Sequence, residues 1–247
     1  MANADHIEPS LDRPVGFLAA LQIQDIILGK LILHGIRTRF ERSRLGYAQA
    51  LLDPCVHLLV WWVLMTFIKE RQSRFGMAPI LVITTGLVPM FLFRNTSKYM
   101  ASSNAAMKRL IRHPQVRPLD VVFARFILEA LTMITVGLII FITMILLGQA
   151  PLPRDPLALF PPLATLLFMG LGFGTFFAVA APISSFFPAC FTIFMRFIYF
   201  TSGIFVLGNH VPLFVMRWFL WNPVFHCVEI FRAAYFDFPI ERFSAFD

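Results

Sequence analysis

Charged residues are scarce in this sequence, and their scarcity excludes most soluble folds. Asp, Glu, Lys and Arg make up 14% of the 247 residues, against 58% hydrophobic residues. A soluble globular domain carries about a quarter charged residues. Residues 157–195 contain no charged side chain at all. Because the apolar runs are too long and unbroken for the alternation of a β-barrel, the sequence predicts an all-α membrane protein.

Cysteines and catalytic motifs are equally sparse. Cys55, Cys190 and Cys227 lie far apart in apolar sequence and match no disulfide framework or metal spacing. The six histidines are scattered, and each is expected to be hydrogen-bonded or exposed rather than a metal ligand. No P-loop, HExxH, GxSxG or CxxC motif occurs. The sequence therefore predicts no catalytic site, metal or cofactor in this chain. The net charge of +7 gathers at the ends of the apolar runs, which favours a membrane over nucleic acid.

The most basic long connection between apolar runs is residues 94–125. It carries seven Lys or Arg residues against one acid, Asp120. Lys and Arg near span ends remain on the cytoplasmic side of a membrane, so this segment is expected inside. Within it, residues 97–112 are expected to form a short cytoplasmic helix that ends before His113-Pro114. Residues 1–13 are polar and carry no secretory signal, so the N-terminus is expected in the cytoplasm as well.

The apolar runs predict one transmembrane domain with five spans. These cover residues 45–68, 77–93, 121–147, 157–181 and 187–207. Before them, residues 14–40 are apolar but interrupted by Gln22, Asp25 and Lys30, which favours an amphipathic interface helix over a weak first span. After them, residues 208–240 form short apolar pieces, predicting re-entrant or surface-lying gate helices beside a pathway.

Ionisable residues inside the spans bear on the energy source. Arg125 and Glu129 share a helix face, and a pair near the cytoplasmic end is favoured over a pump-like carboxylate. Gradient-driven carriers place paired ionisable groups mid-membrane, where only Glu129 and Arg196 are candidates. A transporter driven by a separate motor is therefore favoured. The run GLGFG at residues 170–174 is expected to permit close helix packing, because no strand or lysine accompanies it as in a nucleotide loop.

Four motifs carry a family resemblance. They are RTRF followed by SRLGYAQALLDP within residues 37–54, RL and PQVRPLD within residues 109–120, FTSGIF at residues 200–205, and WNPVFH with Glu229 and Arg232 from residue 221. Together they resemble ABC-2-type permeases that export capsular polysaccharide, over roughly residues 20–237. The resemblance implies a type V exporter-like helical bundle with an interface helix, a coupling helix at residues 97–112 and periplasmic gate helices.

The resemblance also implies a function and partners. The chain would be a homodimeric permease with two separate ATP-binding subunits, which hold the ATP and Mg. It would move a lipid-linked, acidic capsular polysaccharide from cytoplasm to periplasm across the bacterial inner membrane. An adaptor and an outer-membrane channel would be further partners. A permease for O-antigen or teichoic acid is the close alternative; a membrane-embedded glycolipid-modifying enzyme and a small-molecule pump are more distant ones.

Three groups of functional residues follow from the resemblance. ATPase docking is expected at Lys98, Asn104, Lys108, Arg109 and Arg112. The lipid entrance is expected at Arg37, Arg39, Arg42, Arg44 and Tyr47, although the arginines equally serve topology. Pathway and gate residues are expected to be Trp61, Trp62, Phe200, Ser202, Trp221, Asn222, His226, Glu229 and Arg232.

Two features depart from the family pattern. Gln49 stands where many relatives have Trp, so an aromatic contact is not expected there. The family's sixth span has no counterpart before Asp247, so a further C-terminal apolar segment is expected.

Overall fold

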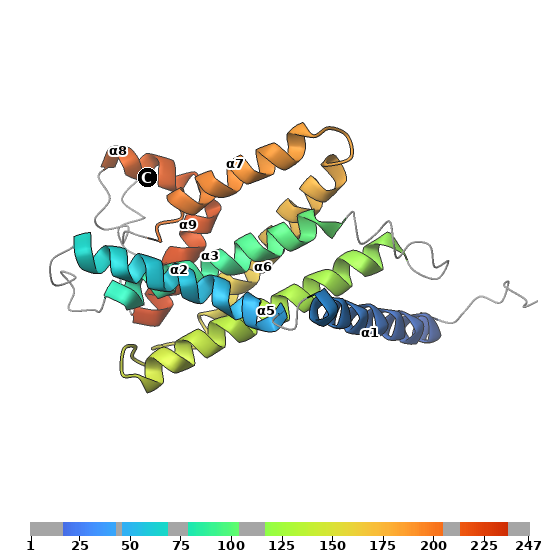
Figure 1. Cartoon of the computed structure of the whole chain (residues 1–247), viewed down its shortest axis with the longest axis horizontal. Coiled ribbons are helices and arrows are strands. Elements are labelled where there is room, and N and C mark those ends of the chain that lie inside the picture. Colours follow the sequence, from blue (N-terminus) through green and yellow to red (C-terminus); the bar gives the residue numbers. More distant parts are fainter. Residues whose placement is uncertain (1–16, 43–45, 69–78, 104–116, 205–212, 237–247) are drawn as a thin grey trace, which may run out of the picture.

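The protein is a bundle of helices, and no strand occurs in the part of the chain that the structure describes. The computed structural model describes residues 17–42, 46–68, 79–103, 117–204 and 213–236. The helices are α1 (Phe17–Arg42), α2 (Gly46–Ile68), α3 (Pro79–Ala101), α5 (Pro118–Leu146), α6 (Phe160–Ala180), α7 (Phe186–Thr201), α8 (Leu213–Leu220) and α9 (Pro223–Phe236) (Figure 1). The predicted all-α class is confirmed.

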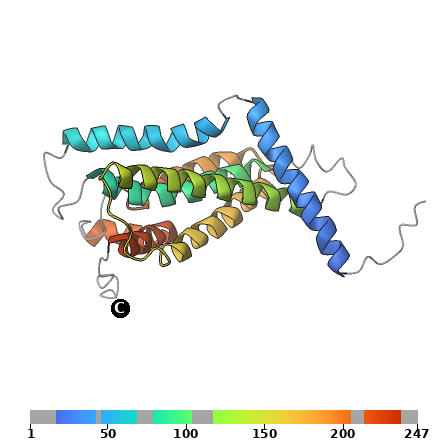
Figure 2. The same cartoon turned by 90° about the horizontal axis from the view of Figure 1, so that it is seen from below.

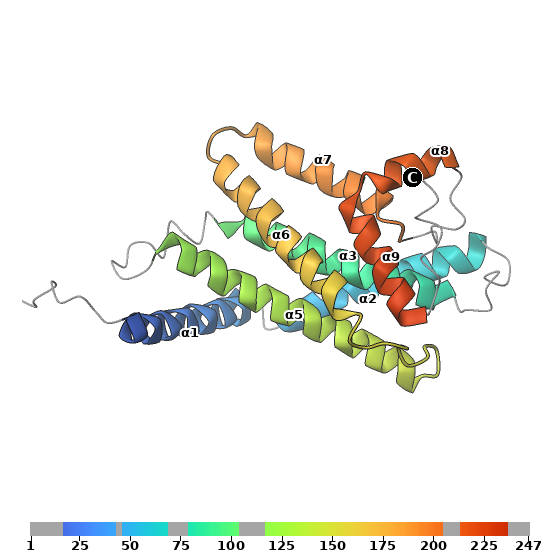
Figure 3. The same ribbon diagram turned by 180° about the vertical axis from the view of Figure 1, so that it is seen from behind.

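Helix α3 lies at the centre of the bundle. It packs against α6, α5, α2 and α9 (Figures 1 and 3). Its first four turns carry no charged residue and are mostly apolar on every side, which is typical of a helix surrounded by others. Leu87, Met90 and Phe93 are accordingly buried, and so is Met100 near its end.

Glycines allow α6 to approach α3 closely. A Cβ at Gly170 would lie 3.0 Å from the Thr96 Cβ, and one at Gly174 would collide with the carbonyl oxygen of Ser97. A Cβ at Gly172 would meet nothing within 4 Å. The predicted close packing is therefore confirmed for Gly170 and Gly174, which share one face of α6, whereas Gly172 faces away.

Three described helices are long and apolar enough to cross a membrane. They cover Ile80–Ala101, Pro118–Leu146 and Phe160–Ala180. Two shorter apolar helical stretches, Leu52–Trp61 and Phe186–Thr201, lie in α2 and α7. The helix expected to run to residue 207 ends at Thr201, because Gly203 takes a left-handed conformation with φ of +73° that stops the helix.

A second boundary also differs from expectation. The helix expected to end at Phe93 continues to Ala101 as α3, because no Pro or Gly interrupts residues 90–101. Arg94 and Lys98 therefore project from a span-length helix rather than from a loop. The first residues of the expected coupling helix, 97–101, belong to α3, and its residues 104–112 lie outside the described residues.

Helix α1 runs obliquely to the bundle and packs against the beginning of α5 (Figure 2). The Gln24 side chain donates a hydrogen bond of 3.1 Å to Asp120 Oδ1. The other oxygen of Asp120 accepts the backbone N–H of Arg117 at 3.1 Å, and Pro118 occupies the first turn of α5. The carboxylate thus caps α5 and ties it to α1.

Candidate functional site

A cavity of about 1160 Å³ lies between α2, α3, α7 and the end of α6. We call it the basic cavity. Its lining residues are Val56, His57, Val60, Trp61, Arg94, Lys98, Ala101, Ser102, Phe177, Ala181, Pro188, Phe191, Thr192, Met195, Arg196, Tyr199 and Phe200. Most of these side chains are apolar or aromatic. Three are permanent cations and none is an acid.

The three cations come from two helices. Arg94 and Lys98 are four residues apart on α3, so they project from the same face. Arg196 projects from α7. In the part of the chain that the structure describes, the side chains of Lys98 and Arg196 are exposed and have no hydrogen bond or ion pair. Both are available to a ligand with negative charge.

Arg94 is already paired. Its Nη2 lies 3.2 Å from Asp53 Oδ2 on α2, and its guanidinium lies 4.6 Å from the centre of the Phe91 ring. Asp53 therefore neutralises part of the positive charge at the edge of the cavity.

Aromatic side chains form the walls. Trp61 Nε1 donates a hydrogen bond of 3.0 Å to the Tyr199 hydroxyl, which links α2 to α7. Phe177 and Phe191 pack edge to face, with ring centres 5.3 Å apart. Aromatic faces beside cations suit a ligand with both apolar CH surfaces and anionic groups.

A second group of polar residues joins α9 to α7. Asn222 precedes Pro223, and its Oδ1 accepts the backbone N–H of Val224 at 3.0 Å, which caps α9. Its Nδ2 donates to the carbonyl of Ile198 at 3.1 Å and to Thr201 Oγ1 at 2.8 Å. Asn222 of the WNP motif thus caps the beginning of α9 and hydrogen-bonds to the last turn of α7.

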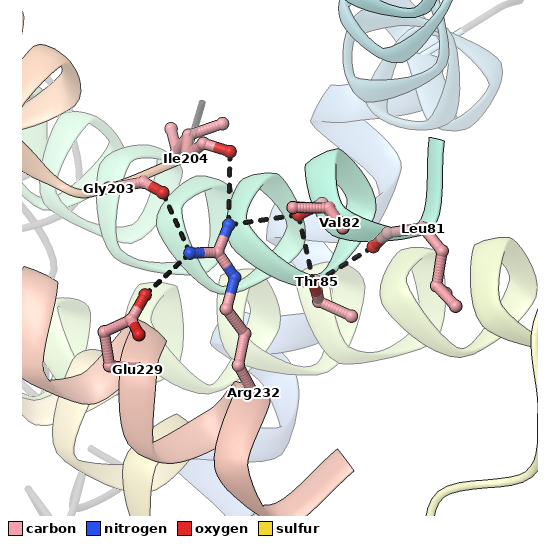
Figure 4. A network of polar contacts seen from close by, with 7 residues as sticks. All are labelled: Leu81, Val82, Thr85, Gly203, Ile204, Glu229 and Arg232. Carbon is pink, nitrogen blue, oxygen red and sulfur yellow. Dashed lines mark hydrogen bonds and ion pairs between the residues drawn. The ribbon is translucent and has the colours of Figure 1, made fainter. Parts of the chain in front are cut away.

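Arg232 adds α3 to this arrangement (Figure 4). Its Nη1 donates to Glu229 Oε1 at 2.7 Å and to the Gly203 carbonyl at 2.9 Å. Its Nη2 donates to the carbonyls of Val82 at 3.0 Å and Ile204 at 3.1 Å. The side chain is 1% exposed. A buried charge needs a counter-charge and hydrogen bonds of this kind. We call Asn222, Glu229 and Arg232, with the backbone that they bind, the α7–α9 joint.

The expected pathway residues divide between these two places. Trp61 and Phe200 line the basic cavity. Ser202, Asn222, His226, Glu229 and Arg232 lie in or beside the joint, where Ser202 donates to the Tyr199 carbonyl and His226 Nε2 donates to the Leu220 carbonyl. Trp221 is 87% exposed and belongs to neither. Trp62 lies in α2, where only its backbone is described.

The other expected sites are described only in part. Lys98 lines the cavity, whereas Asn104, Lys108, Arg109 and Arg112 lie outside the described residues. Arg37 is exposed on α1. Arg39, Arg42 and Tyr47 are described only in their backbone, and Arg44 lies outside the described residues.

Sequence reasoning placed neither Arg94 nor Arg196 in a binding site. The spacing of Arg94 and Lys98 was the available signal, but it becomes informative only once α3 is known to continue through both. Glu129 is buried on α5 and does not line the cavity. No cluster of His, Cys, Asp or Glu suited to a metal occurs among the described residues.

Comparison with known proteins agrees with this architecture. The profile of the ABC-2 type transporter family matches residues 29–236. The chain is 28% identical over 216 residues to the polysialic acid transport protein KpsM of Escherichia coli, covering 87% of this chain and 83% of that protein. It is 27% identical over 233 residues to the capsule polysaccharide export inner-membrane protein CtrC of Neisseria meningitidis serogroup A, covering 92% and 86%.

A third relative is the capsule polysaccharide export inner-membrane protein BexB of Haemophilus influenzae, which is 24% identical over 230 residues and covers 93% of this chain and 86% of that protein. The family profile extends from within α1 to the last residue of α9 and includes both the basic cavity and the joint. This chain therefore belongs to the ABC-2 type transporter family.

Proposed function

We propose that this chain is the membrane-spanning subunit of an exporter that moves a lipid-linked, acidic capsular polysaccharide across the bacterial inner membrane. The observation that carries the proposal is the basic cavity. It combines three cations with aromatic walls and has no acid in its lining. An acidic polysaccharide offers carboxylate or phosphate groups to such cations and CH faces to such rings. The names of the relatives, which specify polysialic acid or capsule polysaccharide, support this class of substrate over O-antigen or teichoic acid.

The energy would come from separate subunits. An ABC transporter couples ATP hydrolysis in its ATPase subunits to movement of its membrane domains, so ATP and Mg would bind to the partner and not to this chain. The segment between α3 and α5, residues 104–116, is the proposed docking element, with Lys108 and Arg109 at its centre. Its flanking helices are already linked, because Arg125 of α5 donates to the Tyr99 carbonyl at 2.9 Å and to Ser102 Oγ at 2.8 Å.

The assembly would contain two copies of this chain and two ATPase subunits. The N-terminus and the 104–116 segment would face the cytoplasm, because the basic residues around them resist translocation. The end of the bundle that holds α8 and α9 would then face the periplasm, where an adaptor and an outer-membrane channel would receive the polymer.

Deletion of the gene in a capsulated host tests the proposal. We expect the acidic polysaccharide to accumulate inside the cell and the surface to lose it, with surface polymer restored by the intact chain. The matched pair for complementation is Arg196→Gln, which removes a cavity cation, and Arg217→Gln, which removes an exposed cation on α8. Unchanged surface polysaccharide in the deletion strain would refute the proposed function.

A further inference from the structure

The α7–α9 joint brings three helices to one guanidinium. Arg232 extends from α9 and binds the carbonyl of Val82 in the first turn of α3, together with the carbonyls of Gly203 and Ile204 just beyond α7 (Figure 4). The Val82 carbonyl also accepts Thr85 Oγ1 at 3.1 Å. The planar fork of Arg can reach several acceptors from one side chain, which the single ammonium of Lys cannot do in the same geometry.

Gly86 of α3 provides the space for this contact. A Cβ at position 86 would lie 2.6 Å from Arg232 Nη2 and 2.9 Å from the Ile204 Cα. Any side chain at this position would therefore displace both the guanidinium and the chain that leaves α7. The absence of a side chain at Gly86 is therefore what lets Arg232 bind against α3.

Helix α9 is also fixed at its two ends. Asn222 caps its beginning and binds the end of α7. Near its end, the Tyr235 hydroxyl donates to the Pro151 carbonyl at 2.7 Å, and the backbone N–H of Asp155 donates to the Ala234 carbonyl at 3.4 Å. The helix is thus held to the α5–α6 connection as well as to α7, and Arg232 extends this attachment to α3.

The joint and the basic cavity lie at different positions along α3. Arg232 binds at Val82, whereas the basic cavity is lined by the second half of α3, from Arg94 to Ser102. At 1.5 Å per residue these points are about 18 Å apart along the helix. The other wall of the cavity is α7, which lines it from Pro188 to Phe200 and is bound at the joint directly after that.

We propose that Arg232, seated on Gly86, is the positioning residue that fixes the ends of α3 and α7 to α9, so that the basic cavity opens and closes about this fixed point. The inference rests on the proposed function, because it assigns the joint a part in the transport cycle. Substrate binds along α7 and the second half of α3, and the contact of α3, α7 and α9 within one subunit persists throughout the cycle.

The native cysteine of α9 offers a probe of how this helix is packed, because Cys227 belongs to the buried core around it. Cys227 is buried at 7% exposure and lies on the same helix as Arg232. With Cys55→Ser and Cys190→Ser it becomes the single thiol of this chain, and the rate at which a water-soluble maleimide attaches to this chain measures exposure of α9. The full complex with its ATPase is labelled without nucleotide and after trapping with ATP and vanadate. We expect slow labelling in both states; an increase of about tenfold or more on trapping would overturn the fixed point.

Two variants break the contact from opposite sides. Arg232→Lys keeps the charge but loses the fork, and Gly86→Ala fills the seat. Each is expected to raise the labelling rate of Cys227 in the folded complex by about tenfold or more, because breaking a buried charge network strongly favours the open form. The matched control is Gly172→Ala, whose added Cβ meets nothing within 4 Å and which is expected to leave the rate unchanged.

The outcomes separate the two proposals. Protected Cys227 in both folded variants would overturn the role of Arg232. If the variants do not assemble, the single-cysteine protein with native Arg232 and Gly86 still tests the fixed point. Its Cys227 labelling is compared without nucleotide and after trapping, and a rise on trapping would overturn the proposal. Loss of polymer export by deletion is measured separately, so a joint that remains protected in a protein that exports no polysaccharide would overturn the proposed function alone.

Discussion

The basic cavity makes a quantitative prediction about charge. Lys98 and Arg196 have exposed side chains without described partners, whereas Arg94 is paired with Asp53 at 3.2 Å. An exposed ionic contact contributes up to about 1 kcal/mol, because solvent and salt screen it. Since 1.4 kcal/mol is a factor of ten, Arg196→Gln is expected to weaken binding of an acidic polymer by up to about fivefold. Lys98→Gln is expected to do the same, and the double variant is expected to weaken binding by up to about 25-fold, because charges on separate helices act independently.

The ion pair of Arg94 predicts an effect of opposite sign. Asp53→Asn removes the charge that neutralises Arg94 and leaves its guanidinium available to the polymer. Affinity is therefore expected to rise by up to about fivefold, from the same estimate of about 1 kcal/mol. A substitution that improves binding is rare for a residue with a structural role, so this variant separates electrostatics from damage to the fold.

The assay is ATP hydrolysis by the complex in lipid nanodiscs, titrated with acidic polysaccharide. The half-saturating polymer concentration is compared at low and high salt, and the differences between variants are expected to shrink as salt screens the exposed charges. Arg217→Gln, which removes an exposed cation outside the cavity, is the matched control, and an uncharged dextran is the control ligand. Equal effects of Arg196→Gln and Arg217→Gln, or weaker binding by Asp53→Asn, would refute the assignment of the cavity.

Three further predictions concern packing, capping and docking. Gly174→Ala is expected to destabilise the protein by about 1–3 kcal/mol, since the added methyl overpacks the α3–α6 contact, whereas Gly172→Ala is expected to be neutral; thermal unfolding in detergent compares them. Asn222→Ala is expected to cost about 2 kcal/mol, about 1 for the lost cap and about 1 for the lost hydrogen bonds to α7, and Asn222→Ser, which retains a cap, about half of that in the same assay. Charge reversal at Lys108 and Arg109 is expected to abolish co-purification of the ATPase and export while the chain still inserts; normal export would contradict the docking proposal.

Some of the joint could be predicted from the sequence because its signals are local. Asn followed by Pro is a strong helix start, and Asn222 and Pro223 begin α9 as this chemistry predicts. The glycine run at residues 170–174 similarly predicted close helix packing, and Gly170 and Gly174 make that contact. The all-α class followed from the length of the apolar runs. In each case a few neighbouring residues determine the outcome.

Other features depend on contacts distant in sequence. Charge favoured a loop from Arg94 onward, yet α3 continues to Ala101, because a positive side chain does not break a helix and can point into a polar cavity. The family resemblance also predicted that Glu229 and Arg232 line the pathway or gate. Their burial in the joint depends on the carbonyls of Val82 and Gly203, which come from segments 150 and 29 residues before Arg232. Composition and residue spacing cannot predict contacts between segments so far apart in the sequence.

The two candidate sites are mechanically connected through α3. This helix begins at the joint with Val82 and Gly86 and ends at the basic cavity with Arg94 and Lys98. It contacts α6 closely through Gly170 and Gly174, so the two helices pack backbone against backbone. Arg125 links the end of α3 to α5, beside the proposed docking segment. A displacement imposed there would reach the cavity first and rotate α3 about Arg232, so the same helix would carry force from the ATPase while its beginning stays attached to α9 within the subunit.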